Sequence, residues 1–374
     1  MKRSGPFRAD QVGSLLRPQS VIQARAQNAA GKLDAQGLKA VEDEAIRQVV
    51  RKQEEVGLRA VTDGEIRREN WSLDFFSQLE GVRVEEMMTA PRAQGSLAPV
   101  SNVLRVARVV EKVRLGEHPM IEHFRFLNQT TKVVGKLTIP APTMIVSASR
   151  DWRQIVDSSV YKGLDDFFDD LAEVYRQFVK AVYAEGCRYL QLDDVNMSYL
   201  CDANMRAKIT ERGDDPEQLL SGWVRVLNDV VSSRPADMAM TTHVCRGNFR
   251  SAWFASGGYE PVAEALFNRI DYDGYFLEYD SDRAGGFEPL RLLPKGDKRV
   301  VLGLVTTKTG ELEDPDVIKA RIEAASKFAP LDQLCLSPQC GFASTHEGNL
   351  LGEAEQWAKL GEIVELSREI WPDA

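Results

Sequence analysis

Apolar residues follow two alternating patterns along the chain, one with the period of a helix and one in short continuous runs. The clearest helical pattern covers 164–182, where apolar side chains recur every three or four positions. A continuous run over 189–192 follows it and ends in Asp193-Asp194. This order of helix and apolar run repeats from about residue 35 onward. Strands that alternate with helices predict a parallel sheet.

Eight apolar runs are candidate strands: 7–12, 58–62, 132–139, 189–192, 238–242, 274–277, 299–305 and 333–336. Helices are predicted between them, and two begin at Asp215-Pro216 and Asp314-Pro315, where Asp is a preferred N-cap and Pro a preferred first residue. Eight strands, most of them followed by a helix, predict a (β/α)₈ TIM barrel. An open doubly wound sheet is the runner-up, but no GxGxxG motif follows the first strand.

The chain exceeds the roughly 250 residues of a typical barrel, and the excess fits best in residues 82–130. Apolar residues there alternate loosely with Arg and Lys, which favours a β-ribbon inserted after the second strand–helix unit. No Ser/Gly-rich linker or solenoid-type repeat interrupts the chain. We therefore expect residues 1–374 to form a single catalytic barrel.

Composition excludes several classes of protein. The apolar content of 43% argues against disorder, and the net charge of −9 argues against a nucleic-acid binder held by bulk attraction to phosphate. No run approaches the ~18 apolar residues of a membrane helix, and the N-terminus lacks the apolar core of a signal peptide. Five scattered cysteines do not indicate a disulfide framework. We expect a cytoplasmic protein without membrane contact, and a homo-oligomer remains possible.

Chemically capable side chains gather where the predicted strands end. In a TIM barrel the active site lies at the carboxyl ends of the strands, so these side chains should meet there. The residues that close or follow a predicted strand are Asp63, Glu65, Asp193, Asp194, His243, Cys245, Glu278 and Cys340.

The pair His243 and Cys245 is the most specific of these signals. Alternate residues of an extended segment point the same way, so an imidazole and a thiolate can reach one metal ion, and this combination suits zinc. Glu278 and Cys340 are the expected further ligands, with Asp280 an alternative to Glu278. A buried thiol beside a hydrogen-bonded core histidine would also explain a bare His-x-Cys pair. The presence of Glu278 and Cys340 at other predicted strand ends favours a metal site instead.

The predicted ligand set favours one reaction class. Zn²⁺ with two thiolates, one carboxylate and a neutral imidazole carries a charge of about −1, which makes it a poor Lewis acid for splitting water. Such a centre suits an incoming thiol, which it deprotonates while the sulfur stays nucleophilic. Glu278 is the ligand that the thiol is expected to displace. The chemistry indicates alkyl transfer to a thiol.

Other polar residues are candidates for binding the substrate. Asp193 and Glu65 could hold an ammonium group, although an N-cap or a salt bridge would explain them equally well. Arg246 could hold an anionic tail or pair with a carboxylate of the barrel.

Taken together, the motifs resemble the C-terminal catalytic barrel of cobalamin-independent methionine synthase over nearly the whole chain. They are, in order, Val12-Gly13-Ser14, Gly64-Glu65, Gln191-Leu192-Asp193, Thr242-His243-Val244-Cys245, Glu278 and Pro338-Gln339-Cys340-Gly341. The resemblance implies zinc ligands at His243, Cys245, Glu278 and Cys340. It also implies that Asp193 and Glu65 bind the amine of homocysteine and Ser14 its carboxylate. The implied activity is that of a 5-methyltetrahydropteroyltriglutamate–homocysteine S-methyltransferase.

The chain departs from that family at the donor side of the site. It has no room for the second, N-terminal barrel of the full synthase and is similar to a short single-barrel branch. Ser147 stands where the synthase has a Trp that packs against the pterin, and Thr306-Thr307-Lys308 replaces an Asp-x-His pair. Lys308 is therefore a candidate for protonating or positioning the leaving group. The predicted catalytic residues are Asp193 and Lys308.

These departures leave two alternatives to a methyl-folate donor with homocysteine as acceptor. The first is an enzyme that resembles the epoxyalkane:coenzyme M transferases, which alkylate a different thiol at a similar zinc site. Arg8, Arg17 and Arg246 would suit either a sulfonate or the glutamate tail of a folate. The second is a non-catalytic, zinc-bearing binding protein.

Overall fold

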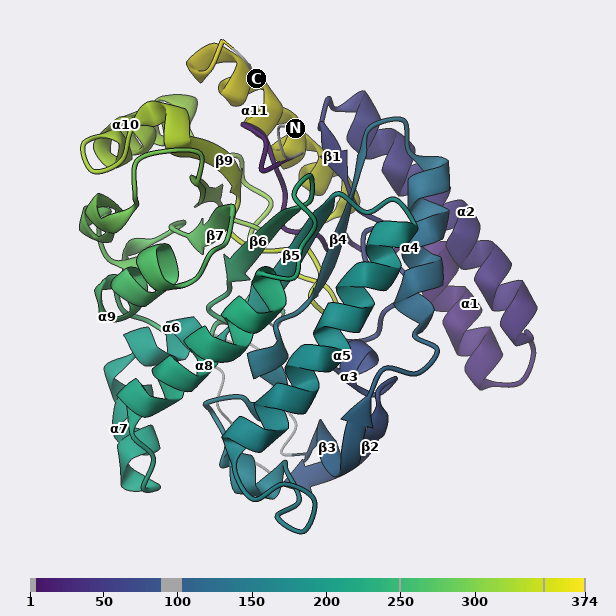
Figure 1. Cartoon of the computed structure of the whole chain (residues 1–374). Coiled ribbons are helices and arrows are strands. Elements are labelled where there is room, and N and C mark those ends of the chain that lie inside the picture. The colour runs from purple at the N-terminus through teal and green to yellow at the C-terminus, as the bar shows by residue number, and fades with distance from the viewer. Residues whose placement is uncertain (1–4, 89–102, 249, 346, 373–374) are drawn as a thin grey trace.

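A curled sheet of seven parallel strands forms the centre of the protein (Figure 1). The computed structural model describes residues 5–88, 103–248, 250–345 and 347–372. The strands are neighbours in the order β1-β4-β5-β6-β7-β8-β9, and every pair is parallel. Their bounds are Ala60–Val61 (β1), Val134–Pro140 (β4), Tyr189–Asp194 (β5), Ala239–Val244 (β6), Gly274–Glu278 (β7), Arg299–Val305 (β8) and Leu334–Pro338 (β9). The predicted TIM-barrel-like fold is confirmed.

The N-terminal segment occupies the eighth position of the barrel without forming a regular strand. Ala9 makes one parallel bridge to Leu336 of β9, and the N–H of Asp10 donates to the Leu336 carbonyl at 3.1 Å. The N–H of Leu336 in turn donates to the Arg8 carbonyl at 2.8 Å, and the Asp10 carboxylate accepts the N–H groups of Phe7 and Gln11 at 3.1 and 2.8 Å. The predicted strand over 7–12 is thus reduced to a single backbone bridge to β9.

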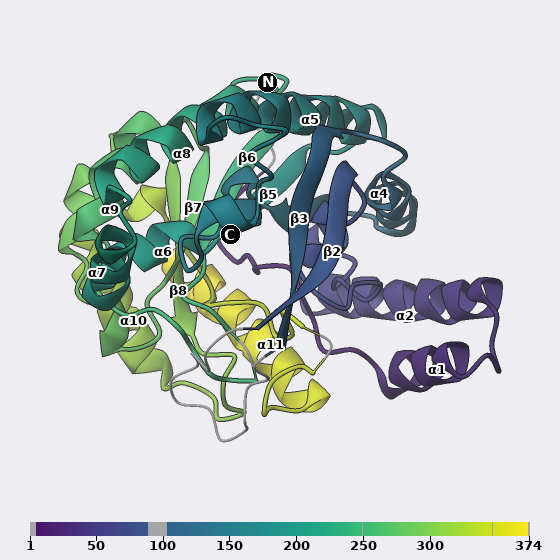
Figure 2. The ribbon, with the colours of Figure 1, turned by 90° about the horizontal axis from the view of Figure 1, so that it is seen from below.

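Helices surround the sheet (Figure 2). Asp215 and Asp314 accept the N–H groups of Glu217 and Asp316, which confirms both predicted N-caps. In the described part of the chain, no helix is long and apolar enough to cross a membrane. The helix bounds are Gln19–Ala29 (α1), Ala35–Glu55 (α2), Leu73–Phe76 (α3), Pro119–Thr130 (α4), Leu164–Ala184 (α5), Asn196–Cys201 (α6), Ala203–Glu211 (α7), Pro216–Val231 (α8), Glu260–Glu264 (α9), Pro315–Ser326 (α10) and Glu353–Ile370 (α11).

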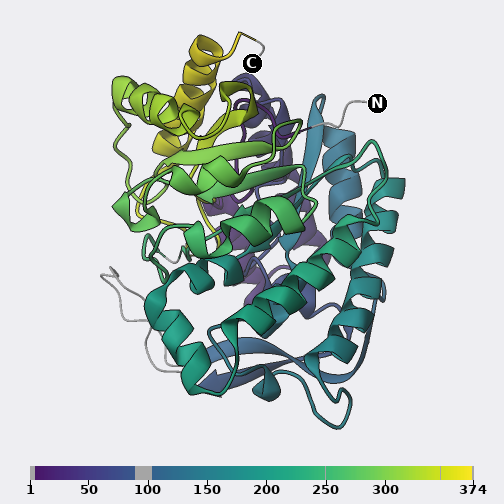
Figure 3. The ribbon, with the colours of Figure 1, turned by 60° about the vertical axis from the view of Figure 1, so that its left-hand side comes forward.

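A two-stranded antiparallel ribbon lies where an insertion is predicted. It consists of β2 (Glu80–Met88) and β3 (Val103–Arg114), and the rest of the predicted range contains α4, which packs against β4 and α5. The ribbon is therefore followed by a helix of the barrel wall. Val109 of β3 exchanges backbone hydrogen bonds with the loop after β4 through Ile155 and Asp157. These bonds place the ribbon at the carboxyl end of the sheet, at the bottom of Figures 1 and 3.

A buried ion pair fills part of the barrel interior. The Lys136 ammonium lies 3.1 Å from Asp10 Oδ1, and neither side chain is exposed. Tyr189 donates its hydroxyl to Asp10 Oδ2 at 2.8 Å, and Lys136 also donates to the carbonyl of Gln11. The ammonium lies 4.0 Å from the centroid of the Phe276 ring. This pair ties the N-terminal segment to β4 and β5.

We expect the Lys136→Met variant to be destabilised by about 3–5 kcal/mol, because it leaves the Asp10 carboxylate buried without its cation. The midpoint of urea unfolding measures the change. Lys52→Met is the control, since Lys52 pairs with Glu353 on the surface and its loss should cost less than about 1 kcal/mol. Equal midpoints for Lys136→Met and wild type would contradict the assigned role.

Candidate metal centre

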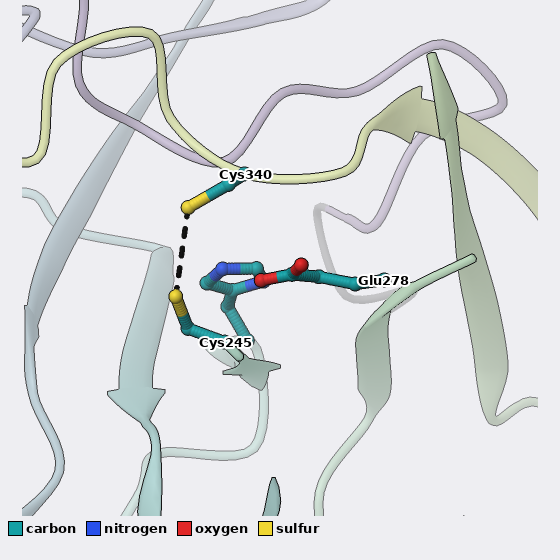
Figure 4. Close-up of side chains that lie close together, drawn as sticks. Cys245, Glu278 and Cys340 are labelled. Carbon is teal, nitrogen blue, oxygen red and sulfur yellow. Dashed lines mark hydrogen bonds between the residues drawn. The ribbon is translucent and has the colours of Figure 1, made fainter. Parts of the chain in front are cut away.

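The four predicted ligands meet at the carboxyl end of the sheet. His243 is the residue before the last of β6, Cys245 directly follows β6, Glu278 ends β7 and Cys340 follows β9. One ligand atom from each lies within 4.8 Å of every other, and all four residues are buried. Figure 4 shows the labelled Cys245, Glu278 and Cys340 side chains converging from three segments of the chain. The four residues could hold a metal ion.

The two thiols form the closest pair in the group. The Sγ atoms of Cys245 and Cys340 lie 3.6 Å apart, and both cysteines are free (Figure 4). Their hydrogen bond holds the pKa of Cys340 well below its usual range and raises the pKa of Cys245. The N–H of Gly247 also donates to Cys245 Sγ at 3.2 Å. A thiolate at Cys340 is thereby favoured, and the thiolate is the form that binds metals.

His243 supports the metal assignment independently. Its imidazole is 2% exposed, and neither ring nitrogen has a hydrogen-bond partner among the described residues. Buried polar atoms nearly always have a partner, so an unpaired imidazole between two thiols and a carboxyl group calls for one. A metal ion with nitrogen and sulfur ligands would supply it.

Glu278, not Asp280, belongs to the ligand group. Glu278 Oε1 accepts the N–H of Arg246 at 2.7 Å, and Oε2 lies 3.1 Å from Nη2 of Arg283. Asp280 points to other partners: Arg283 Nη2 at 2.7 Å, the Thr306 hydroxyl at 3.1 Å and the Lys308 ammonium at 3.5 Å. Burial raises the pKa of Glu278, which a bound cation would reverse.

Asp193 and Glu65 are both buried at the same end of the barrel. Asp193 is the residue before the last of β5, its Oδ1 accepts a hydrogen bond from Gln191 at 2.7 Å, and burial raises its pKa to about 7. Glu65 follows β1, and its Oε1 accepts the Thr138 hydroxyl at 2.9 Å and lies 3.3 Å from Arg68 Nη1. Glu65 has a φ of 56°, a strained conformation for a residue other than glycine, and such strain is typical of functional sites.

Ser14 is held against the loop that carries Cys340. Its Oγ accepts the N–H of Ala343 at 3.3 Å, and its carbonyl accepts the N–H of Phe342 at 2.9 Å. A Cβ on Gly341 would lie 2.0 Å from Ser14 Oγ, so only glycine allows this approach. Ser14 therefore lies beside the loop that carries Cys340, and its binding of a substrate carboxylate stays a prediction.

The three arginines expected around the substrate have different surroundings. Arg17 donates to the carbonyls of Glu65 at 2.9 Å and Arg68 at 3.1 Å, and also to that of Ala343, so it joins the loops of the site. Arg246 is fully buried, with its guanidinium 4.4 Å from the Tyr259 ring centroid. Substrate contacts of these two residues remain predictions. The prediction that Arg8 lines the pocket is wrong, because Arg8 donates to carbonyls at the amino end of β9, opposite the site.

Lys308 lies in the loop after β8, beside the candidate metal site. Its ammonium is 3.5 Å from Asp280 Oδ2. Its positive charge contributes to the lowered pKa of Cys340 and partly opposes the rise that burial causes in the pKa of Glu278. Arg283 is the site residue that sequence reasoning missed. The acidic pair Glu278 and Asp280, followed within five residues by an arginine, is the signal that was available.

Comparisons with known proteins agree on one family. Residues 7–365 match the family described as cobalamin-independent synthase, catalytic domain. The uncharacterized protein YxjH of Bacillus subtilis is 44% identical over 371 residues, which are 99% of this chain and 96% of that protein. A methionine synthase of Saccharolobus solfataricus is 22% identical over 96% of this chain and 93% of its own length.

Solved structures show the same fold. A candidate vitamin-B12-independent methionine synthase from Listeria monocytogenes superposes with a TM-score of 0.78 at 40% identity, covering 99% of both chains. A B12-independent methionine synthase from Shewanella in complex with selenomethionine superposes with a TM-score of 0.72 at 19% identity, covering 97% of both chains.

We expect the Cys340→Ala variant to lose most of its zinc when the purified protein is equilibrated with a zinc buffer, because one of four ligands is removed. Elemental analysis measures the metal per chain. Cys335→Ala is the matched control: Cys335 lies five residues earlier, is buried inside the barrel and should keep the wild-type zinc content. Wild-type zinc content in Cys340→Ala would overturn the ligand assignment.

Proposed function

The chain belongs to the cobalamin-independent synthase catalytic-domain family, and we propose from this premise that it is a zinc-dependent methyltransferase acting on the thiol of homocysteine. The observation that carries the proposal is the buried group of His243, Cys245, Glu278 and Cys340, with ligand atoms within 4.8 Å of one another. Two thiols, one carboxylate and one imidazole match the ligand types and number of a zinc site.

The ligand set supports thiol alkylation over hydrolysis. Three anionic ligands would make bound zinc electron-rich, which suits it to keep a thiol deprotonated and nucleophilic rather than to activate water. Hydrolytic zinc sites more often use neutral histidines. We infer that residues 1–374 act as one catalytic barrel around this centre.

The surrounding residues fit an amino-acid thiol. Asp193 and Glu65 offer buried carboxyl groups for its ammonium group, and bringing that charge next to Asp193 would favour the ionised carboxylate. Ser14 offers a hydroxyl for its carboxylate beside the Cys340 loop. Holding both ends of the amino acid orients its sulfur toward the centre and toward the donor.

Methyl transfer forms one bond and breaks another. The acceptor sulfur forms a bond with the methyl carbon of the donor, the bond from that carbon to the donor's heteroatom breaks, and the leaving group takes up a proton. Lys308 is the residue we propose for supplying the proton or positioning the leaving group, with Asp280 and Thr306 holding its loop. A methyl-folate is the donor that the family implies.

Zinc-edge X-ray absorption of the zinc-loaded protein tests the proposal. Addition of homocysteine should change the site from two sulfur ligands to three, because the substrate thiol enters and Glu278 leaves. An unchanged spectrum with homocysteine and a third sulfur with coenzyme M would favour the sulfonate thiol as acceptor. A site that stays at two sulfur ligands with both thiols would contradict thiol activation.

We expect the Asp193→Asn variant to bind homocysteine about 10- to 100-fold more weakly, because the ammonium loses a charged hydrogen-bond partner. Thiol titration followed by X-ray absorption measures the affinity. Mercaptobutyrate, which lacks the amino group, is the control and should bind wild type and variant equally. Equal affinities for homocysteine would contradict the ammonium-binding role of Asp193.

A further inference from the structure

Arg283 contacts the metal centre without being one of its ligands. It lies in the short 3₁₀ turn Asp282–Ala284 that follows β7, and its side chain is 10% exposed. Its Nη2 lies 3.1 Å from Oε2 of Glu278 and 2.7 Å from Oδ1 of Asp280. One guanidinium therefore bridges a metal ligand and a neighbouring carboxylate.

The guanidinium is held in place independently of Glu278. Its shorter bond is to Asp280, and Asp280 is itself fixed by the hydroxyl of Thr306 at 3.1 Å. The guanidinium also lies 5.8 Å from the ring centroid of Trp253, and the Arg283 carbonyl accepts the N–H of Gly257 at 2.8 Å. Movement of the Glu278 carboxylate would therefore leave Arg283 where it is.

Each oxygen of the Glu278 carboxylate has a hydrogen-bond donor outside the group of thiols and imidazole. Oε1 accepts the backbone N–H of Arg246 at 2.7 Å, and Oε2 has Arg283. Glu278 is fully buried, and a carboxylate that leaves a metal inside a protein needs a compensating charge, since an unpaired buried charge is very costly. These two donors contact the carboxylate in the position where it faces the other ligands, and it would keep them after leaving a metal.

We propose that Arg283 is a positioning residue that holds the Glu278 carboxylate when an entering thiol displaces it from the metal. This inference rests on the proposed function. With zinc bound, the exchange would replace the Glu278 oxygen by the thiol sulfur as a ligand, and the proton of the thiol would pass to solvent. Arg283 thus sets how readily the centre accepts a thiol, while the four ligands set whether it binds zinc.

The test compares Arg283→Met and Arg283→Lys with wild type. Zinc affinity is measured by competition with a chelator, and thiol entry by zinc-edge absorption during a homocysteine titration. Arg283→Met should retain zinc, while the homocysteine concentration that half-converts two sulfur ligands to three rises about tenfold or more, because the displaced carboxylate loses a charge-assisted bond. Arg283→Lys should recover part of the loss. Arg291→Met is the matched control, since Arg291 pairs with Glu260 on the surface.

A loss of zinc affinity in Arg283→Met with an unchanged homocysteine midpoint would overturn the inference, because Arg283 would then orient Glu278 as a ligand. If Arg283→Met does not fold, Asp280→Asn loosens the same guanidinium and should shift the midpoint in the same direction; an unshifted midpoint there overturns the inference as well. Failure of the proposed function is distinct, since wild type itself would then lack zinc or never gain a third sulfur.

Discussion

Two thiols, a carboxyl group and an imidazole are buried within 4.8 Å of one another, and the loops around the site are arranged to compensate the charge of this group. Two of the three potentially anionic ligands have donors that the surrounding protein supplies: a backbone N–H for Cys245, and a backbone N–H and Arg283 for Glu278. The third, Cys340, contacts the thiol of Cys245. Only His243 lacks a partner among the described residues. A single divalent cation would give the imidazole a partner and compensate most of the negative charge of the anionic ligands.

The loops that carry the site are tied together by hydrogen bonds between distant segments. Arg17 links the N-terminal segment to the loop after β1 and to the loop after β9. Gln339, next to Cys340, accepts the N–H of Thr307 at 2.6 Å and so joins the loops after β8 and β9. These links fix the relative positions of ligands that come from separate strands, and such pre-organisation is what a binding site of several segments requires.

The ionisable groups of the site have two different types of surroundings. The four ligands contact one another, whereas Asp280, Arg283 and Lys308 form a second charged group beside them. Glu278 alone belongs to both, through its two oxygens. This position is the one from which the proposed exchange of Glu278 for a substrate thiol would start.

Sequence by itself determined the alternation of strands and helices, because local periodicity and capping residues act over short distances. The strand β8 begins and ends where the pattern predicts, and α8 and α10 begin directly after the predicted N-caps Asp215 and Asp314. It also placed His243, Cys245, Glu278 and Cys340 at strand ends, and parallel strands must bring those ends to one face. Only the tertiary structure decided that the segment over 7–12 makes a bridge in place of a strand, that Lys136 pairs with Asp10 inside the barrel, and that Arg283 contacts Glu278. These outcomes depend on contacts between residues far apart in the chain or on the orientation of a side chain, and no local pattern encodes either.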